Sequence, residues 1–137
     1  MINLTNFKVL TNLYICPTPI GNLQDISARV LKTLETVDVI YCEDTRRARK
    51  LIENFSISTP LKSYFVGNEK IKIAEIEKTL SEGKNVALIS DAGTPCISDP
   101  AYKLIREAIN VDVKIESIPG PSAFLAALTA SGLPTDR

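Results

Sequence analysis

The sequence predicts an α/β fold: a three-layer α/β/α sandwich built on a mainly parallel sheet of roughly five strands. Two observations predict this class. Short apolar runs rich in β-branched residues alternate along the chain with segments whose apolar residues recur at helical spacing. The 137 residues, 45% of them hydrophobic and 23% charged, are enough for one domain with a sizeable core.

Two strand–helix units fill the first part of the chain. LYICP (13–17) predicts a buried strand that ends at its proline, and Asp25 can cap the helix that follows. VDVIYC (37–42) predicts a second buried strand, because it holds β-branched residues and no turn former. Asp44 or Thr45 can cap the next helix. The apolar positions of that helix are Ala48, Leu51, Ile52 and Phe55.

The middle of the chain predicts a weaker strand and a longer helix. LKSYFV (61–66) is either an edge strand or a loop. Asn68 can cap a helix that ends with Gly83 at the C′ position. The apolar stripe of that helix is Ile73, Ile76 and Leu80.

The last third repeats the alternation. VALIS (86–90) predicts the third buried strand, and Ser98 or Asp99 can cap a helix with Pro100 near its first turn. VKIESI (113–118) predicts an edge strand, and 119–134 predicts a Pro/Gly turn followed by an Ala/Leu-rich helix. The apolar positions of the helix after Pro100 are Ala101, Leu104, Ile105, Ala108 and Ile109.

Composition narrows the class of protein. The formal net charge is +0 and no apolar run approaches the ~18 residues of a membrane span, so we expect no membrane association. The cysteines Cys16, Cys42 and Cys96 are scattered, and the chain has no histidine. These counts predict no disulfide framework, no metal site and a reducing, cytoplasmic location.

Polar and turn-forming residues crowd after each expected strand. In a parallel sheet these loops meet at one edge, where ligands bind. They are Pro17–Asn22, Glu43–Arg46, Asp91–Pro100 and Pro119–Ser122. The alternative is that these loops are purely structural, since strand–helix loops need glycine, proline and capping acids even where nothing binds. In that case Asp25, Asp44 and Asp99 are only helix N-caps.

Motifs and residue types that the sequence lacks argue against several classes of ligand and reaction. It contains neither GxGxxG nor GxxxxGK[ST], which counts against a dinucleotide or a nucleoside triphosphate. The chain has no histidine, which is the usual general base that activates a serine nucleophile, so a serine hydrolase is disfavoured. A reaction that depends mainly on holding two reactants in line fits better.

Five stretches of the sequence together resemble a known protein family. They are LYICPTPIGNLQDIS, CEDTRRARKLI, SYFVGNE, VALISDAGTPCISDPAYKLI and IPGPSAFLAALTASGLPTDR. Together they resemble, in order and over about residues 12–137, the N-terminal domain of a family of bacterial rRNA methyltransferases in the tetrapyrrole methylase superfamily. Members of that family methylate the ribose 2′-OH of a cytidine in the 16S rRNA of the small ribosomal subunit.

The resemblance implies S-adenosylmethionine (SAM) as methyl donor, held between two α/β domains, usually in a homodimer. It implies donor contacts from the loop after the first strand, the GTP-like loop and the PGPSA-type turn. Carried onto this sequence, the donor-binding residues are Ile20, Gly21, Asp91, Gly93, Thr94, Pro95, Ile97, Ser98, Ser122 and Ala123. SAM has no phosphate, which agrees with the missing phosphate loop.

The acceptor side follows less directly from the resemblance. A ribose hydroxyl is a poor nucleophile, so we expect a carboxylate to act as its base. Glu43, Asp44 and Asp91 are the candidates, with Asp44 preferred because the EDTR motif is nearly intact. The basic residues beside it offer phosphate contacts to RNA, or form a solvated helix face. They are Arg46, Arg47, Arg49 and Lys50.

The sequence also departs from the family. Val66-Gly67 stands where a histidine is common, and Cys96 and Ala101 each replace a glycine. Cys96 would keep the loop's path only with φ below zero. We expect an N-terminal extension over 1–12 and a tetrapyrrole-methylase-like domain over 13–137, with the family's second domain absent from this chain.

Two other functions stay open on this sequence. One is a methyltransferase acting on a tetrapyrrole or another small molecule, and the other is a non-catalytic RNA- or partner-binding fragment. The EDTRRARK stretch favours RNA, because a small macrocycle does not need an arginine-rich helix beside the cleft.

Overall fold

A computed structural model describes residues 11–99 and 101–136 and confirms the expected α/β class. The elements in chain order are β1 (Asn12–Ile15), the 3-10 helix η1 (Leu23–Asp25), α1 (Ala28–Thr36), β2 (Val39–Cys42), α2 (Thr45–Asn54), β3 (Leu61–Ser63), α3 (Glu69–Ser81), β4 (Val86–Leu88), α4 (Ala101–Asn110), β5 (Lys114–Ser117) and α5 (Ala123–Ala130). Most of the expected N-terminal extension, and Pro100, lie outside the described residues.

All five strands form one parallel sheet in the order β3-β2-β4-β1-β5. Val86 of the central β4 pairs with Leu13 on one side and with Val39 on the other. The central strands are buried on both faces, which explains their continuous apolar runs. The edge strands β3 and β5 are only partly buried, as expected for 61–66 and 113–118.

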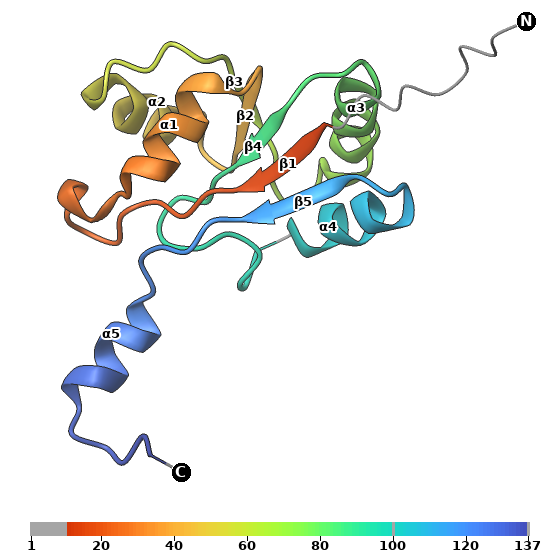
Figure 1. Ribbon diagram of the computed structural model, residues 1–137. Coiled ribbons are helices and arrows are strands. Elements are labelled where there is room, and N and C mark those ends of the chain that lie inside the picture. Colours follow the sequence, from red (N-terminus) through yellow and green to blue (C-terminus); the bar gives the residue numbers. More distant parts are fainter. Residues whose placement is uncertain (1–10, 100, 137) are drawn as a thin grey trace, which may run out of the picture.

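Helices cover both faces of the sheet and complete the three layers (Figure 1). Val30 and Leu34 of α1 and Ala48 and Ile52 of α2 pack into one apolar core with Ile40 and its neighbours on the same face of the sheet. The opposite face packs against α3 and α4. Its helical residues are Ile76, Leu80, Ala101, Leu104 and Ala108. Successive strand residues point to opposite faces, so both cores draw on the same strands.

Two local expectations are wrong. Asp25 does not cap α1, because it ends the short 3-10 helix η1, and the Ser27 side chain instead accepts from the Val30 N–H at 3.1 Å. Ile109 lies on the expected apolar stripe of α4 yet is 63% exposed. It sits on the helix flank beyond the face that Leu104 and Ala108 bury, where none of the described elements covers it.

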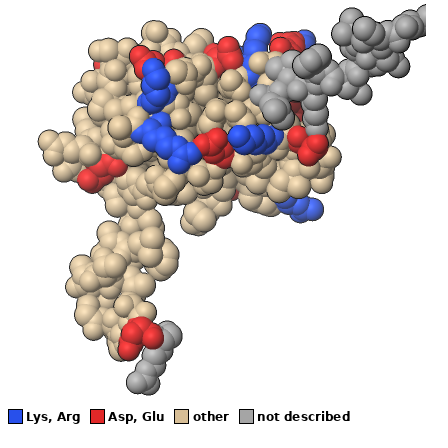
Figure 2. All heavy atoms as spheres, viewed as in Figure 1, with Lys and Arg blue, Asp and Glu red and all other residues tan. Residues whose placement is uncertain are grey.

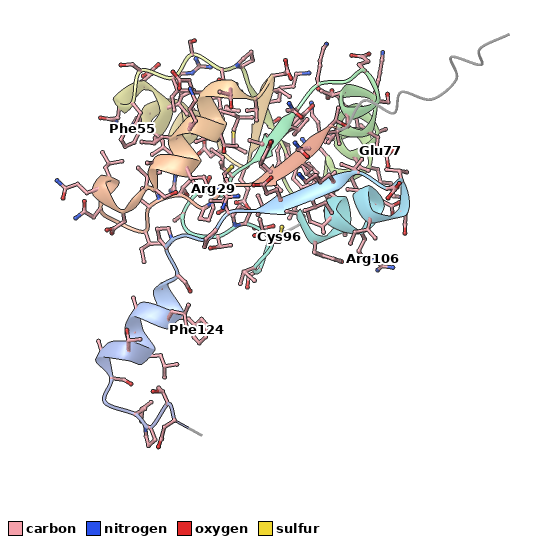
Figure 3. The ribbon with its side chains drawn as sticks, in the orientation of Figure 1. Arg29, Phe55, Glu77, Cys96, Arg106 and Phe124 are labelled. Carbon is pink, nitrogen blue, oxygen red and sulfur yellow. The ribbon has the colours of Figure 1, made fainter. Side chains whose placement is uncertain are left out.

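α5 stands apart from the sandwich (Figures 1 and 3). None of its residues is buried, and Phe124, which is 71% exposed, lies on the segment that projects away from the sheet. Figure 2 shows that the projecting arm carries almost no charge. No helix in the described part of the chain is long and apolar enough to cross a membrane.

A charged network ties the edge strand β3 to α3. The Tyr41 hydroxyl donates to Glu75 Oε1 at 2.9 Å, and the Lys72 ammonium lies 2.7 Å from Oε2. Lys62 of β3 also pairs with Glu75. These partners lower the pKa of Glu75 to about 2, with Lys62 the largest cause.

Glu75→Gln is therefore expected to lower the free energy of unfolding by about 1–2 kcal/mol at pH 7. A depressed carboxyl pKa stabilises the fold above its unfolded value, and this contribution disappears as pH falls from about 4.5 toward 2. Urea unfolding of wild type and variant at pH 7 and pH 3 measures the difference. Glu77→Gln is the control, because Glu77 has no ion pair among the described residues. A Glu75 effect that does not shrink at pH 3 would contradict the network's role.

Candidate functional site

The loops after β1 and β4 are joined backbone to backbone at the carboxyl edge of the sheet. Thr18 N–H donates to the Gly93 carbonyl at 2.9 Å, and Gly93 N–H donates back to Thr18 at 3.0 Å. The Thr18 hydroxyl, which is 2% exposed, also donates to the Ser90 carbonyl at 3.2 Å. These bonds hold both loops in one fixed arrangement.

The loop after β5 joins the same cluster. The Thr94 hydroxyl donates to the Pro121 carbonyl at 3.2 Å. Gly120 lies so close to the Pro17 ring that a Cβ on it would be 2.5 Å from the Pro17 Cβ. Gly93 adopts φ +77°, and a Cβ there would be 3.3 Å from Ile20 Cγ2. Three of the four expected ligand loops are joined in this way, and the loop after β2 adjoins them, since Asp44 N–H donates to the Asp91 carboxylate at 3.3 Å.

The expected donor-binding residues fall into three groups. One group, Gly21, Asp91 and Pro95, lines hollows beside the joined loops. Ile20, Gly93 and Thr94 belong to the joined cluster, with Ser122 directly after Pro121. Ser122 is the N-cap of α5, but its side chain makes no capping hydrogen bond. Ile97, Ser98 and Ala123 add no hydrogen bond between the loops in the described part of the chain. Ile97 is 74% exposed and offers an apolar side chain to solvent.

The GTP-like loop has a more strained backbone than expected. Cys96 was expected with φ below zero, but it has φ +72°, and Ser98 has φ +60°. Asp99 explains this conformation, since its carboxylate accepts from Cys96 N–H at 2.7 Å and from Ala101 N–H at 2.8 Å. The left-handed region costs a side-chain-bearing residue about 1–2 kcal/mol, which is why glycine suits the position. Asp99 therefore both caps α4 and shapes this loop.

The two neighbouring acids after β2 face different surroundings. The Asp44 side chain caps α2 by accepting from Arg46 N–H at 2.8 Å, and it pairs with the Arg46 guanidinium. The Arg46 side chain is the main reason that the pKa of Asp44 lies below its usual value. Glu43 instead lines a small recess with Pro95 and Asp99. Burial, then the charges of Asp91 and Asp99, raise the pKa of Glu43.

Three of the four basic residues of α2, Arg46, Arg47 and Lys50, share one hollow with Asp44, and Arg49 lies apart from them. Arg47 and Lys50 line a pocket toward the loop after β1, whereas Arg49 lines another toward 57–61. Two of the four cations are already paired, Arg46 with Asp44 and Arg47 with Asp91. No group of three or more His, Cys, Asp or Glu residues among those described could hold a metal ion.

Two parts of the site were not predicted as such. Thr18 binds two loops together but is a single buried threonine, and no spacing pattern marks it. The contact of Gly120 with Pro17 joins residues from opposite ends of the chain. The only signal for both was their place directly after expected strands.

The fold and the loop cluster define a class of protein with known members. Residues 12–137 match the family described as tetrapyrrole (corrin/porphyrin) methylases. The chain belongs to this family.

Individual relatives carry a more specific name. Proteins named ribosomal RNA small subunit methyltransferase I include one of Mesorhizobium japonicum, 50% identical over 124 residues that cover 90% of this chain and 42% of that protein. The relative of Thermotoga maritima is 49% identical, covering 91% of this chain and 56% of that protein. The chain thus spans about half the length of the curated relatives it matches.

Solved structures agree on the fold. A cobalt precorrin-4 methyltransferase matches with a TM-score of 0.73 at 22% identity, covering 98% of this chain and 56% of that one. A uroporphyrin-III-C-methyltransferase from Thermus thermophilus matches with a TM-score of 0.68 at 20% identity, covering 93% of this chain and 55% of that one. At such identities the likeness concerns the fold alone.

Proposed function

We propose that this chain is the donor-binding domain of a SAM-dependent methyltransferase that modifies the ribose 2′-OH of a cytidine in 16S rRNA. The observation that carries the proposal is the cluster of three loops joined by the Thr18–Gly93 bridge and the Thr94–Pro121 hydrogen bond. Relatives about half identical to the chain are named rRNA methyltransferases, which favours RNA over a tetrapyrrole.

The residues present fit the donor. A Cβ on Gly93 would lie 3.3 Å from Ile20 Cγ2 and 3.7 Å from the Pro121 carbonyl oxygen, so the three loops come close together at this glycine. Ile20 and Ile97 are exposed apolar side chains suited to contact the adenosine of SAM. The Ser122 hydroxyl makes no capping hydrogen bond to α5, so it can serve as a polar partner. When bound, SAM supplies an electrophilic methyl group to the acceptor oxygen.

The chain's own contribution to the reaction is a base and a rigid frame. We propose Glu43 rather than Asp44 as the group that takes the proton of the ribose hydroxyl. A raised pKa makes Glu43 the stronger proton acceptor, and its recess adjoins Pro95 of the donor loop. Asp44 is occupied as the cap of α2 and by Arg46.

We further propose that the protein works as a homodimer in the cytoplasm, where its ribosomal substrate is found. Support for a dimer comes from α5. It exposes Phe124 and Leu125 on an uncharged arm that the described part of the chain does not cover. An exposed apolar surface of this kind marks a contact with another protein surface.

Thr94→Arg is expected to reduce SAM binding below detection, because the larger side chain replaces the hydroxyl that holds Pro121 and enters the loop cluster. Isothermal titration calorimetry measures SAM affinity. Thr94→Ser is the control, since it keeps the hydroxyl and should bind nearly as well as wild type.

Because the relatives are about twice as long, the titration is run on this chain and on a fused chain carrying the C-terminal half of the Thermotoga maritima relative. No SAM binding by either would contradict the proposed function. Unchanged affinity in Thr94→Arg would show that the donor binds elsewhere.

A further inference from the structure

A pocket of about 260 Å³ lies beside the loop cluster, between the loop after β1, the loop after β4 and α2. It lies just below the roughly 300–1,000 Å³ of pockets for drug-sized ligands, which suits a ligand no larger than one nucleotide. Its lining residues are Pro19, Gly21, Leu23, Arg47, Ala48, Lys50, Leu51, Asn54, Ile89, Ser90 and Asp91.

One flank of α2 supplies the wall that carries the polar groups. Residues 47, 50, 51 and 54 follow the i, i+3, i+4, i+7 spacing that places side chains on one side of a helix. The loop after β1 supplies an apolar wall, formed by Pro19 and by Leu23, which is 45% exposed. The pocket therefore joins an apolar wall to a cationic one.

The two cationic side chains in the pocket differ in their ion pairs. The Arg47 guanidinium lies 3.5 Å from the Asp91 carboxylate, which also accepts from Asp44 N–H at 3.3 Å. Asp91, which is held by the backbone N–H of Asp44 in the loop after β2, thus orients the Arg47 side chain. Lys50 has no ion pair within residues 11–99 and 101–136. Two cations against one carboxylate leave the pocket with an excess of positive charge.

Asn54 adds a directed polar group. Its Nδ2 donates to the Lys50 carbonyl at 2.7 Å, which fixes the amide, and its Oδ1 accepts no hydrogen bond from the described residues. An apolar wall, an anchored amide and an excess cation match three features of a nucleotide: the face of its base, the edge of its base and its phosphate.

We propose that this pocket binds one nucleotide of the RNA next to the methylated ribose, with its base against Pro19 and Leu23 and its phosphate at Lys50 and Arg47. This inference rests on the proposed function, since it assigns a neighbouring nucleotide of the same RNA substrate. It also divides the basic run of α2, because Arg49 faces a different pocket and has no part in this contact.

The test titrates cytidine 5′-monophosphate into the isotope-labelled chain at low salt and follows backbone amide shifts by NMR. We expect shifts at Gly21, Leu23, Lys50 and Asn54. Lys50→Ala should weaken binding about fivefold through loss of a charged phosphate contact. Leu23→Ser, an exposed position that tolerates change, should weaken it through loss of the base wall.

Arg49→Ala is the matched control: it removes the same charge from the adjacent position of the same helix and should leave the affinity unchanged. Equal losses in the Lys50 and Arg49 variants, or no shifts at the pocket amides, would overturn the inference. If SAM still binds in those cases, the proposed function stands while the pocket assignment falls. Failure of SAM to bind either chain in the calorimetric test would remove the proposed function instead.

Discussion

Glu43→Gln is expected to lower the rate of methyl transfer to 16S rRNA by about 10²–10⁴-fold, the usual contribution of a positioned general base. Glutamine keeps the shape of the side chain but cannot accept the proton. Because the pKa of Glu43 is raised, mainly by burial, its ionised form is disfavoured in the folded protein. The neutral variant should therefore be at least as stable as wild type. Transfer from labelled SAM, measured with the fused chain, gives the rate.

Asp44→Asn serves as the matched control for that experiment. Asparagine is as good an N-cap as aspartate, so α2 should keep its start and the rate should stay within a few-fold of wild type. A large loss of rate in Asp44→Asn, with Glu43→Gln nearly normal, would reverse the assignment of the base. Wild-type activity should also decline as pH falls through the raised pKa of Glu43.

Gly120→Ala is expected to lower the free energy of unfolding by about 1–3 kcal/mol and to weaken SAM binding with it. The new Cβ would lie 2.5 Å from the Cβ and 2.7 Å from the Cγ of Pro17. Pro17 is buried and its ring is rigid, so the loops after β1 and β5 must separate. Separation moves Pro121 away from the Thr94 hydroxyl and opens the loop cluster.

Gly132→Ala separates this steric effect from backbone strain. Gly132 has φ +71° with nothing within 4 Å of an added Cβ, so alanine there strains the backbone without a clash. It should lower stability by about 1 kcal/mol and leave SAM affinity unchanged. Urea unfolding and calorimetry on both variants provide the comparison. An unaltered SAM affinity in Gly120→Ala would show that the contact with Pro17 does not shape the donor site.

The sheet and its helices could be predicted from the sequence because parallel strands buried on both faces are continuous apolar runs. VIYC and VAL are fully buried in β2 and β4, with no alternation to obscure them. The start of α1 could not be predicted reliably. Asp25 and Ser27 are both good N-cap residues two positions apart, and the 3-10 turn η1 decides between them.

The position of the candidate site could be predicted, but not its internal contacts. Loops that follow parallel strands share an edge whatever their sequence, so Pro17–Asn22 and Asp91–Pro100 were expected together. Glu43 and Asp44 are adjacent in the sequence, and only the fold shows that Glu43 lines the recess with Pro95 while Asp44 caps α2. Likewise, the positive φ of Cys96 follows from the Asp99 carboxylate, a contact that no spacing reveals.

The strand order also has a consequence for how the chain folds during its synthesis. β1 pairs with β4 and β5, as the pairs Leu13–Val86 and Asn12–Lys114 show. The first strand to be synthesised therefore cannot pair until the last two strands have been made. Only β2 and β3 are neighbours both along the chain and in the sheet. Contacts between residues so far apart in sequence slow folding. A nascent chain shorter than about 118 residues therefore lacks β5 and leaves that edge of β1 unpaired.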